Sequence, residues 1–251
     1  MGYAIDIEAT NGLPVEHWLA ARFAKRLYRL REELPELGLG PDGKVIVVVQ
    51  ESEGVWQRDR FSCSLQQKTA HDEIALFREV RAAVEAELVQ LAQILPSLSP
   101  KMPDDITVNG AGAFEVGGPE GDNGLSGKKL VMDAYGPRVP IGGGAWSGKD
   151  FFKADRAGGL HARRIAKHVV RLGLATEATV VLGWFPGNRS AQILQITDQL
   201  GQQVKLKNMD TLFDTSLLTS GEKFGSKELT ELARWGHFFD ENCIWEVLHK
   251  I

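Results

Sequence analysis

Four lysines lie among glycine-rich loops in the middle of the chain: Lys128, Lys129, Lys149 and Lys153. Ten glycines occur in the 32 residues from 117 to 148, a density too high for the interior of helices or strands. Glycine-rich loops let backbone N–H groups approach an anion closely, and lysine side chains add full positive charges. This pattern predicts a site for a small polyanion such as a nucleotide.

The charge of the chain is concentrated in the same region. Residues 127–171 contain ten Lys and Arg against three Asp, a net charge of +7, whereas the whole chain carries −4. The overall negative charge argues against nucleic acid or an anionic membrane as the partner. Within the segment, the cations from Arg163 to Arg171 are typical of a solvated helix face. The lysines next to glycines fit that interpretation less well and favour a ligand site.

Two glycine motifs are compatible with phosphate binding. Residues 143–149 satisfy the G-x-x-x-x-G-K pattern of a P-loop, but Asp150 stands where the Ser or Thr that holds Mg²⁺ is required. The motif also lies in the middle of the chain, rather than early in an alternating α/β pattern, so a P-loop nucleotidase is disfavoured. The other glycine motif, residues 117–124, could equally be a series of surface turns.

Other kinds of chemistry have little support in the sequence. The six histidines do not show the spacing of common zinc sites, and His237, between aromatic residues, is interpreted as a histidine at the edge of the core. The two cysteines, Cys63 and Cys243, cannot form a disulfide framework, which indicates a reducing cytoplasm. The longest aliphatic run, Val45–Val49, is far shorter than the ~20 residues that span a bilayer.

The elements that must position these residues follow from hydrophobic periodicity. A turn is expected at Gly38–Gly43, and a hinge at Pro96 and Pro100. Helices are predicted over residues 15–34, 72–95, 160–172, 211–218 and 227–235. Strands are predicted over residues 44–50, 55–65, 106–108, 114–116, 179–185 and 193–197.

The order of these elements favours an α+β fold, with mixed or antiparallel sheets and helices packed on one face. Two domains are predicted. Residues 1–112 form a first α+β domain of helix, strand pair and helix. Residues 113–251 form the glycine- and lysine-rich ligand-binding region and a C-terminal α+β domain.

Two long motifs resemble those of the S-adenosylmethionine synthetase (methionine adenosyltransferase) family. The first runs from Gly117 to Gly136 and reads GGPEGDNGLSGKKLVMDAYG. The second runs from Gly142 to Arg156 and reads GGGAWSGKDFFKADR. Fainter similarities occur at Pro41–Lys44 and from Trp235 to Glu246, so that the resemblance extends over nearly the whole chain.

The resemblance covers the C-terminal two-thirds of the family pattern. Family members begin with a further third that carries a His-Pro-Asp-Lys motif, a gating loop and a Gly-Asp-Gln-Gly segment, none of which occurs here. The resemblance therefore implies one subunit of a split synthetase. A separate chain would supply the missing part, giving a cytoplasmic hetero-oligomer built on synthetase-like dimers.

The reaction that the resemblance implies is an SN2 displacement. The sulfur of methionine attacks C5′ of ATP and expels triphosphate, which is then hydrolysed to pyrophosphate and phosphate. A thioether has no proton to lose, so catalysis depends on alignment and on stabilising the charged leaving group. Mg²⁺ and K⁺ are the cofactors implied.

Carried over position by position, the family assigns roles to residues of both predicted domains. Lys44, Lys128, Lys129 and Lys149 would contact the phosphates, and Asp155 would serve the metal–phosphate cluster. Asp42 and Asp122 would hold the nucleoside and the methionine amino group. Phe114 would stack on adenine, and Lys153 would meet the methionine carboxylate. The implied catalytic set is Lys44, Lys128, Lys129, Lys149, Lys153 and Asp155, and Gly43 and Ala145 complete the ATP-binding set.

Several positions depart from the family pattern. Lys128 replaces an arginine, which loses a bidentate phosphate contact. Ala113, Gly40 and Ile141 stand where the family has two arginines and a histidine, and the segment Trp184–Gly187 replaces the usual adenine wall. Two alternatives stay open on these grounds. One is a non-catalytic regulatory or structural homologue that assembles with a synthetase, and the other is an enzyme that uses a related nucleophile or nucleotide.

Overall fold

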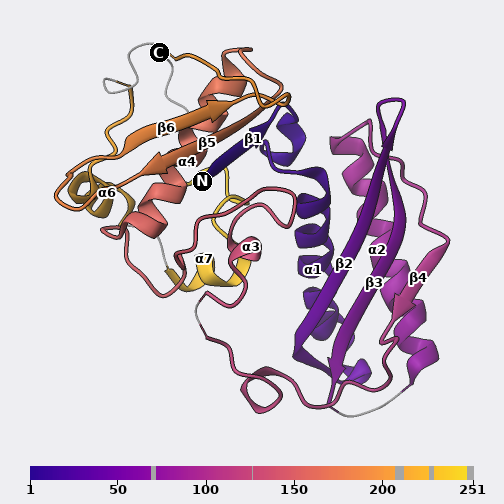
Figure 1. Cartoon of the computed structure of the whole chain (residues 1–251). Helices are drawn as coiled ribbons and strands as arrows, with labels where there is room; N and C mark the ends of the chain where they lie inside the picture. The colour runs from indigo at the N-terminus through magenta and orange to yellow at the C-terminus, as the bar shows by residue number, and fades with distance from the viewer. Residues whose placement is uncertain (69–71, 126, 207–211, 226–228, 248–251) are drawn as a thin grey trace. The chain divides into compact units, whose positions relative to one another are not determined.

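The computed structural model describes residues 1–68, 72–125, 127–206, 212–225 and 229–247. The chain forms two compact units (Figure 1). The N-terminal strand unit consists of Met1–Pro14 together with Leu125–Ile251, and the hairpin unit is Val15–Gly124. The α+β class is confirmed, with helices beside two three-stranded sheets. The compact units divide after residues 14 and 124. The predicted domain boundary between residues 112 and 113 stays a prediction.

The hairpin unit is built on a long antiparallel strand pair, β2 (Leu39–Ser52) and β3 (Val55–Gln67), with β4 (Asp105–Val108) parallel to β3. Helix α1 (Val15–Glu33) packs on β2 and on α2 (Glu73–Ile94). The ring of Phe23 in α1 meets that of Phe61 in β3 edge-on, with centroids 5.6 Å apart. The two long helices and the strand pair predicted from the hydrophobic stripes are therefore confirmed.

Two local predictions in the hairpin unit are wrong. Gly38–Gly43 was expected to be a turn, but β2 already begins at Leu39. A β-bulge absorbs the irregular residues, because Leu39 pairs with Gln67 and Gly43 with Leu65. Residues 114–116 were expected to be a strand and lie outside the sheets. They are nevertheless held beside β3, since the N–H of Gln67 donates to the carbonyl oxygen of Phe114 over 2.9 Å.

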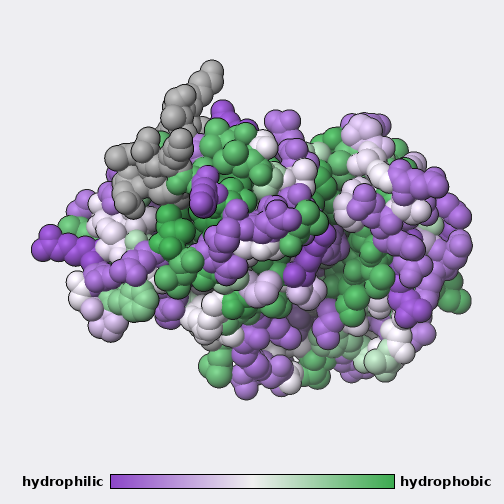
Figure 2. Space-filling model, turned by 45° about the horizontal axis from the view of Figure 1, so that its top comes forward, coloured by the Kyte–Doolittle hydropathy of each residue, from purple (hydrophilic) through white to green (hydrophobic). Residues whose placement is uncertain are grey.

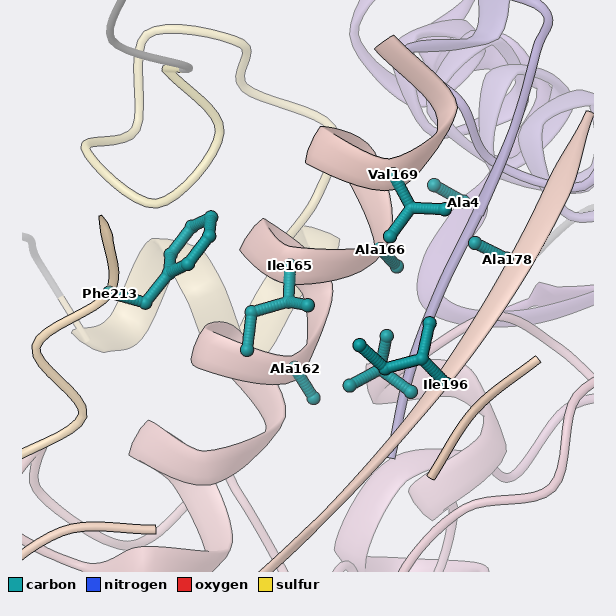
Figure 3. Packing of buried hydrophobic residues seen from close by; sticks show 9 residues of the cluster. Ala4, Ala162, Ile165, Ala166, Val169, Ala178, Ile196 and Phe213 are labelled. Carbon is teal, nitrogen blue, oxygen red and sulfur yellow. The ribbon is translucent and has the colours of Figure 1, made fainter. Parts of the chain in front are cut away.

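The N-terminal strand unit contains an antiparallel sheet in the order β1 (Gly2–Ile5), β5 (Glu177–Gly183), β6 (Gln192–Thr197). Helix α4 (Ala154–Arg171) covers one face of this sheet. Small residues allow the close approach: a Cβ placed on Gly2 would lie 2.0 Å from the carbonyl carbon of Ala162. Figure 3 shows the core between helix and sheet, where alanines alternate with larger aliphatic side chains such as Ile165, Val169 and Ile196.

The remaining helices of the described residues are short. They are α3 (Leu130–Asp133), α6 (Leu217–Phe224) and α7 (Leu229–Trp235), with 3-10 turns at Glu8–Thr10, Pro35–Leu37 and Gly118–Glu120. The prediction of a helix over residues 211–218 is wrong for residues 213–216, which are not helical; α6 begins at Leu217, and residue 211 lies outside the described residues. The helix predicted over 227–235 is found from Leu229, and residues 227 and 228 are likewise not described.

Most of the cations from Arg163 to Arg171 do not lie on a solvated face, contrary to the prediction, and only Arg171 of this set is exposed. Arg163 is fully buried and donates to the backbone oxygens of Tyr3 over 2.7 Å and of Gly12 over 2.9 Å. Its guanidinium also lies 3.1 Å from a carboxylate oxygen of Glu246, which Lys167 approaches to 2.9 Å. These buried ion pairs fasten α4 to the start of the chain and to the segment around Glu246.

Apolar side chains also reach the surface. Ile46 and Val48 on β2 and Leu194 on β6 are exposed, and Figure 2 shows hydrophobic patches among hydrophilic residues on the face displayed. Among the described residues, the hydropathy of each helix falls short of that of a membrane span.

Candidate functional site

The residues assigned to the site divide between the two units. Asp42, Gly43, Lys44, Phe114 and Asp122 belong to the hairpin unit, and the later residues belong to the N-terminal strand unit. Each group is built on its own framework. The structure brings together Lys149 with Asp155 in one unit and Asp42 with the glycine loop at residue 118 in the other.

In the N-terminal strand unit, the key contact is an ion pair at the beginning of α4. The Nζ of Lys149 lies 2.5 Å from Oδ2 of Asp155. Lys153 is the N-cap residue of α4, and Asp155 lies in its first turn. The positive end of the helix dipole stabilises negative charge there, whether it is the carboxylate of Asp155 or an anionic ligand. The side chain of Lys153 is exposed to solvent.

A buried arginine fixes the loop that carries Lys149. Arg156 is 1% exposed, and its guanidinium donates to the carbonyl oxygen of Lys149 and to Nε2 of His237, the latter over 3.0 Å. Burial and the adjacent guanidinium lower the pKa of His237 to about 3, so its ring is neutral at physiological pH. Since a neutral, buried imidazole accepts this hydrogen bond, His237 is a structural residue, in agreement with its interpretation from the sequence.

Glycines let the loops of the site approach one another. A Cβ on Gly144 would lie 1.8 Å from Oδ1 of Asp155, so a larger residue there would displace the carboxylate. Gly127 has a φ of +82°, and a Cβ there would lie 2.9 Å from the Cβ of Ala145. The turn that precedes the exposed Lys128 and Lys129 therefore lies against the loop that leads to Lys149.

A cavity of about 230 Å³ lies beside Asp155. Its walls include the glycines at 142–144 and the rings of Trp146 and Trp184. The two rings rest on consecutive glycines of α4: a Cβ on Gly159 would lie 2.2 Å from Trp146, and one on Gly158 would lie 2.7 Å from Trp184. The sequence assigned neither glycine to the site. A pair of glycines inside a helical pattern was the available signal, because it indicates a close approach by another group.

Asp133, one of the acids in the motif at residues 117–136, is connected to the motif at residues 142–156. The hydroxyl of Ser147 donates to Oδ1 of Asp133 over 3.2 Å. Burial raises the pKa of Asp133, while the hydrogen bonds from Ser147 and the charge of Arg156 oppose that shift. This contact joins the end of α3 to the glycine loop ahead of Lys149. Asp133 and Ser147 are thus additional members of the framework that sequence reasoning did not assign to the site.

In the hairpin unit, Asp42 is fixed by the glycine loop. Its Oδ2 accepts from the N–H of Gly118 over 2.7 Å, and a Cβ on Gly117 would lie 2.8 Å from the Cβ of Asp42. Lys44 follows two residues later on β2 and is exposed. Phe114 is half-buried, and Asp122 is exposed.

A metal would find few protein ligands in the described residues. None of their His, Cys, Asp and Glu side chains gather in groups of three or more that could hold an ion. Asp155 offers one exposed carboxylate, and Lys149 already contacts one of its oxygens.

Comparison with known proteins gives consistent similarities. Residues 116–247 match the family model described as the S-adenosylmethionine synthetase C-terminal domain. The whole chain is 33% identical to the S-adenosylmethionine synthase of Thermosynechococcus vestitus, and 98% of it aligns with that of Synechococcus sp. at 34% identity. Over 74% of the chain, the identity to the S-adenosylmethionine synthase of Rhodospirillum centenum is 37%.

These relatives are longer than this chain. The alignment covers 65% of the Thermosynechococcus and Synechococcus proteins and 46% of the Rhodospirillum protein. The match to the family model runs from residue 116 to residue 247 and so includes both glycine motifs in full, together with the ion pair at the start of α4.

Proposed function

Because the chain belongs to the S-adenosylmethionine synthetase family, we propose that it takes part in making S-adenosylmethionine from ATP and methionine. The observation that carries this proposal is the Lys149–Asp155 pair at the N-terminus of α4, bordered by exposed lysines and glycine loops. Such a surface suits a triphosphate, because it offers fixed positive charge and backbone N–H groups in the same place.

In the proposed reaction, the sulfur of methionine attacks C5′ of ATP and the C5′–O bond to the triphosphate breaks. The electron pair of that bond leaves with the triphosphate, and water then cleaves the triphosphate to pyrophosphate and phosphate. Lys128, Lys129 and Lys149 would stabilise the charge that develops on the leaving group. Lys44 would do the same from the hairpin unit. Lysines placed before the reaction begins lower the barrier, since they need not reorganise as charge develops.

The remaining assigned residues would position the two substrates. Phe114 would stack on adenine, and Lys153 would meet the methionine carboxylate. Asp42 and Asp122 would hold the nucleoside and the methionine amino group. The hydrogen bond from Gly118 to Asp42 supports such a role, because it fixes the carboxylate in one orientation.

Mg²⁺ and K⁺ are part of the proposal. Mg²⁺ is commonly held by one or two carboxylates together with substrate phosphates, a donor set that fits the single exposed carboxylate of Asp155 next to phosphate-binding lysines. When bound, the ion would neutralise charge on the triphosphate. K⁺ is proposed from the family resemblance alone.

We further propose that protein outside these 251 residues completes the active site. A second chain, joined in a cytoplasmic hetero-oligomer, is the form that the motifs imply. A non-catalytic homologue that modulates a synthetase is the second candidate. It is favoured by the substitutions at Gly40, Ala113 and Ile141 and by the mutual neutralisation of Lys149 and Asp155.

The test is reconstitution of activity. The chain would be mixed with a polypeptide that carries the N-terminal third of a relative, and formation of S-adenosylmethionine and pyrophosphate from ATP and methionine would be measured with Mg²⁺ and K⁺. Activity of the mixture supports the proposal.

Binding of a non-hydrolysable ATP analogue separates the two candidates, because a purely structural subunit would leave nucleotide binding of the assembly unchanged. An active assembly whose activity survives the Lys149→Met and Lys153→Met changes would show that the site assignment is wrong.

A further inference from the structure

The hairpin unit contains a second cavity, formed by residues that have no part in the proposed synthetase site. Its volume is about 400 Å³, and it lies between β3 and the segment that connects α2 to β4. Arg58 of β3 lines this cavity and is only 6% exposed. Such a volume falls within the range of about 300–1,000 Å³ that is typical of small-molecule sites.

The cavity arises because two neighbouring segments diverge. Trp56 forms a parallel bridge with Leu98, and Arg60 pairs with Asp105 further along the same two segments (β3 and β4 in Figure 1). Between these two contacts, the connecting segment is three residues longer than β3. Residues 99–104 therefore bow away from β3, and Arg58 lies at the point of divergence.

The hydrogen bonding of Arg58 is incomplete. Its Nη2 donates to the carbonyl oxygen of Lys101, but Nε and Nη1 are buried without an acceptor among the described residues. The other deeply buried arginines differ. Arg156 is bonded to His237 and to the backbone of Lys149, and Arg163 to Glu246 and three backbone oxygens. Buried charged groups are normally paired, so Arg58 is the exception among these three.

The electrostatic surroundings of Arg58 point the same way. Burial lowers its pKa to about 10, and no carboxylate of the described residues opposes that shift. Of the acids around the cavity, Asp105 is paired with Arg60 at 2.6 Å. Asp59 and Asp104 are exposed to water, which screens their charge, and so is the cation Lys101.

We propose that this cavity binds a small oxyanion, represented by phosphate, with Arg58 as its main ligand and Lys101 at its mouth. A guanidinium presents a planar set of donors that matches phosphate and carboxylate oxygens. An anion in the cavity would supply the counter-charge that Arg58 lacks within the described residues. The site lies wholly within the hairpin unit.

The test is the binding of inorganic phosphate to the full chain, followed by ³¹P NMR and by the melting temperature at constant ionic strength. A ligand that binds the folded state raises the melting temperature with its concentration. Phosphate is expected to do so in the wild type. Arg58→Met should lower the affinity for phosphate at least about tenfold, the effect of losing one charged hydrogen bond.

Controls isolate the site. Arg78→Met, which removes a 72% exposed arginine side chain of α2, should retain the phosphate response. The double variant Lys149→Met with Lys153→Met should also retain the phosphate response. If phosphate bound at the synthetase site instead, this double variant would lose the response. Arg58→Met should fold, because it replaces an incompletely bonded buried charge by an apolar side chain of similar length. If it does not, Arg58→Lys keeps the charge but not the planar donor set, and its affinity for phosphate should still fall.

Two results would overturn the proposal: an equal phosphate response in the wild type and the Arg58 variants, or no response of the wild type to phosphate, glycerol 3-phosphate or citrate. Comparing these three probes distinguishes free phosphate, a phosphomonoester and a carboxylate as the source of the oxyanion. Synthetase activity is not measured, so a failure here is independent of the proposed function.

Discussion

Lys149 and Asp155 form an ion pair across 2.5 Å at the beginning of α4. Both residues were assigned to the charged part of one substrate site, and in the structure each already neutralises the other. Their side chains are 34% and 44% exposed, so water weakens the pair and its contribution to stability is less than ~1 kcal/mol. The contact can therefore open without much cost, so that Lys149 can turn to a phosphate and Asp155 to a metal ion.

This opening predicts that activity and stability separate in variants of the pair. Lys149→Met should lower the rate of S-adenosylmethionine formation by the active assembly roughly 10²–10³-fold, the usual loss when one charge-stabilising donor is removed. Asp155→Asn should also lower it. Neither should change the free energy of unfolding by more than ~1 kcal/mol. Lys205→Met, an exposed lysine of the same unit, serves as the control. An unchanged rate in Lys149→Met would contradict the assignment.

Gly159→Ala should destabilise the protein, although alanine is the better helix former. The gain in helix propensity is about 1 kcal/mol, but the new Cβ would lie 2.2 Å from the ring of Trp146. Overpacking of this kind costs about 1–3 kcal/mol, so the steric effect should outweigh the propensity in urea unfolding. Gly124→Ala, at a glycine outside the helices, is the control for the added methyl group, because a Cβ there meets no atom within 4 Å. Equal stability of the two variants would refute the close packing of Trp146 on α4.

Arg163→Met should be among the most destabilising single changes in the chain. It leaves the buried carboxylate of Glu246 with Lys167 and the amide of Asn11 as partners, and it removes the donors from the backbone oxygens of Tyr3 and Gly12. Breaking such a buried pair costs about 3–5 kcal/mol. Arg138→Met removes the more exposed pair with Glu177, which spans 3.4 Å, and should cost less than ~1 kcal/mol. Chemical denaturation of both variants measures the difference, and similar losses would mean that burial does not strengthen the Arg163 network.

Stability should decline as the pH falls from about 6.5 toward 3. The pKa of His237 is lowered to about 3 in the folded protein, below the ~6.5 of an unfolded chain. Between these values the unfolded state binds a proton that the folded state does not, so acid favours unfolding. The stabilising effect is thus complete above pH 6.5. His237→Gln should reduce the slope of unfolding free energy against pH by up to about 1.4 kcal/mol per pH unit. A slope identical to that of the wild type would contradict this.

Much of the fold could be predicted from local patterns. The stripe of apolar residues that includes Phe23 and Leu27 defined α1, and the aliphatic run from Val45 to Val49 defined the centre of β2. The strand β1 was not predicted, because four residues carry little periodicity and its partner β5 lies far along the chain. Similarly, the bulge after Leu39 depends on pairing with β3, which the local turn residues do not reveal.

The candidate site could be predicted in composition but only partly in geometry. The glycine–lysine pattern indicated Lys149, and its partner Asp155 lies only six residues further along the chain. The burial of Arg163 was missed because its partner Glu246 is 83 residues away. A cation whose counter-charge is distant in sequence looks like any solvated cation. The unsatisfied Arg58 was missed for a related reason, since nothing in a sequence shows where two strands will diverge.

The pairing of β1 with β5 also governs the order in which the chain can fold during synthesis. Gly2 pairs with Val180, so β1 cannot pair with β5 until the ribosome has made about 175 further residues. The segment Val15–Gly124 is complete long before that and has its own core of α1, α2 and β3. It can therefore fold first, while β1 is left with exposed strand edges and without its partner strand β5. We expect this interval to be where the newly made chain is most prone to aggregation and most in need of a chaperone.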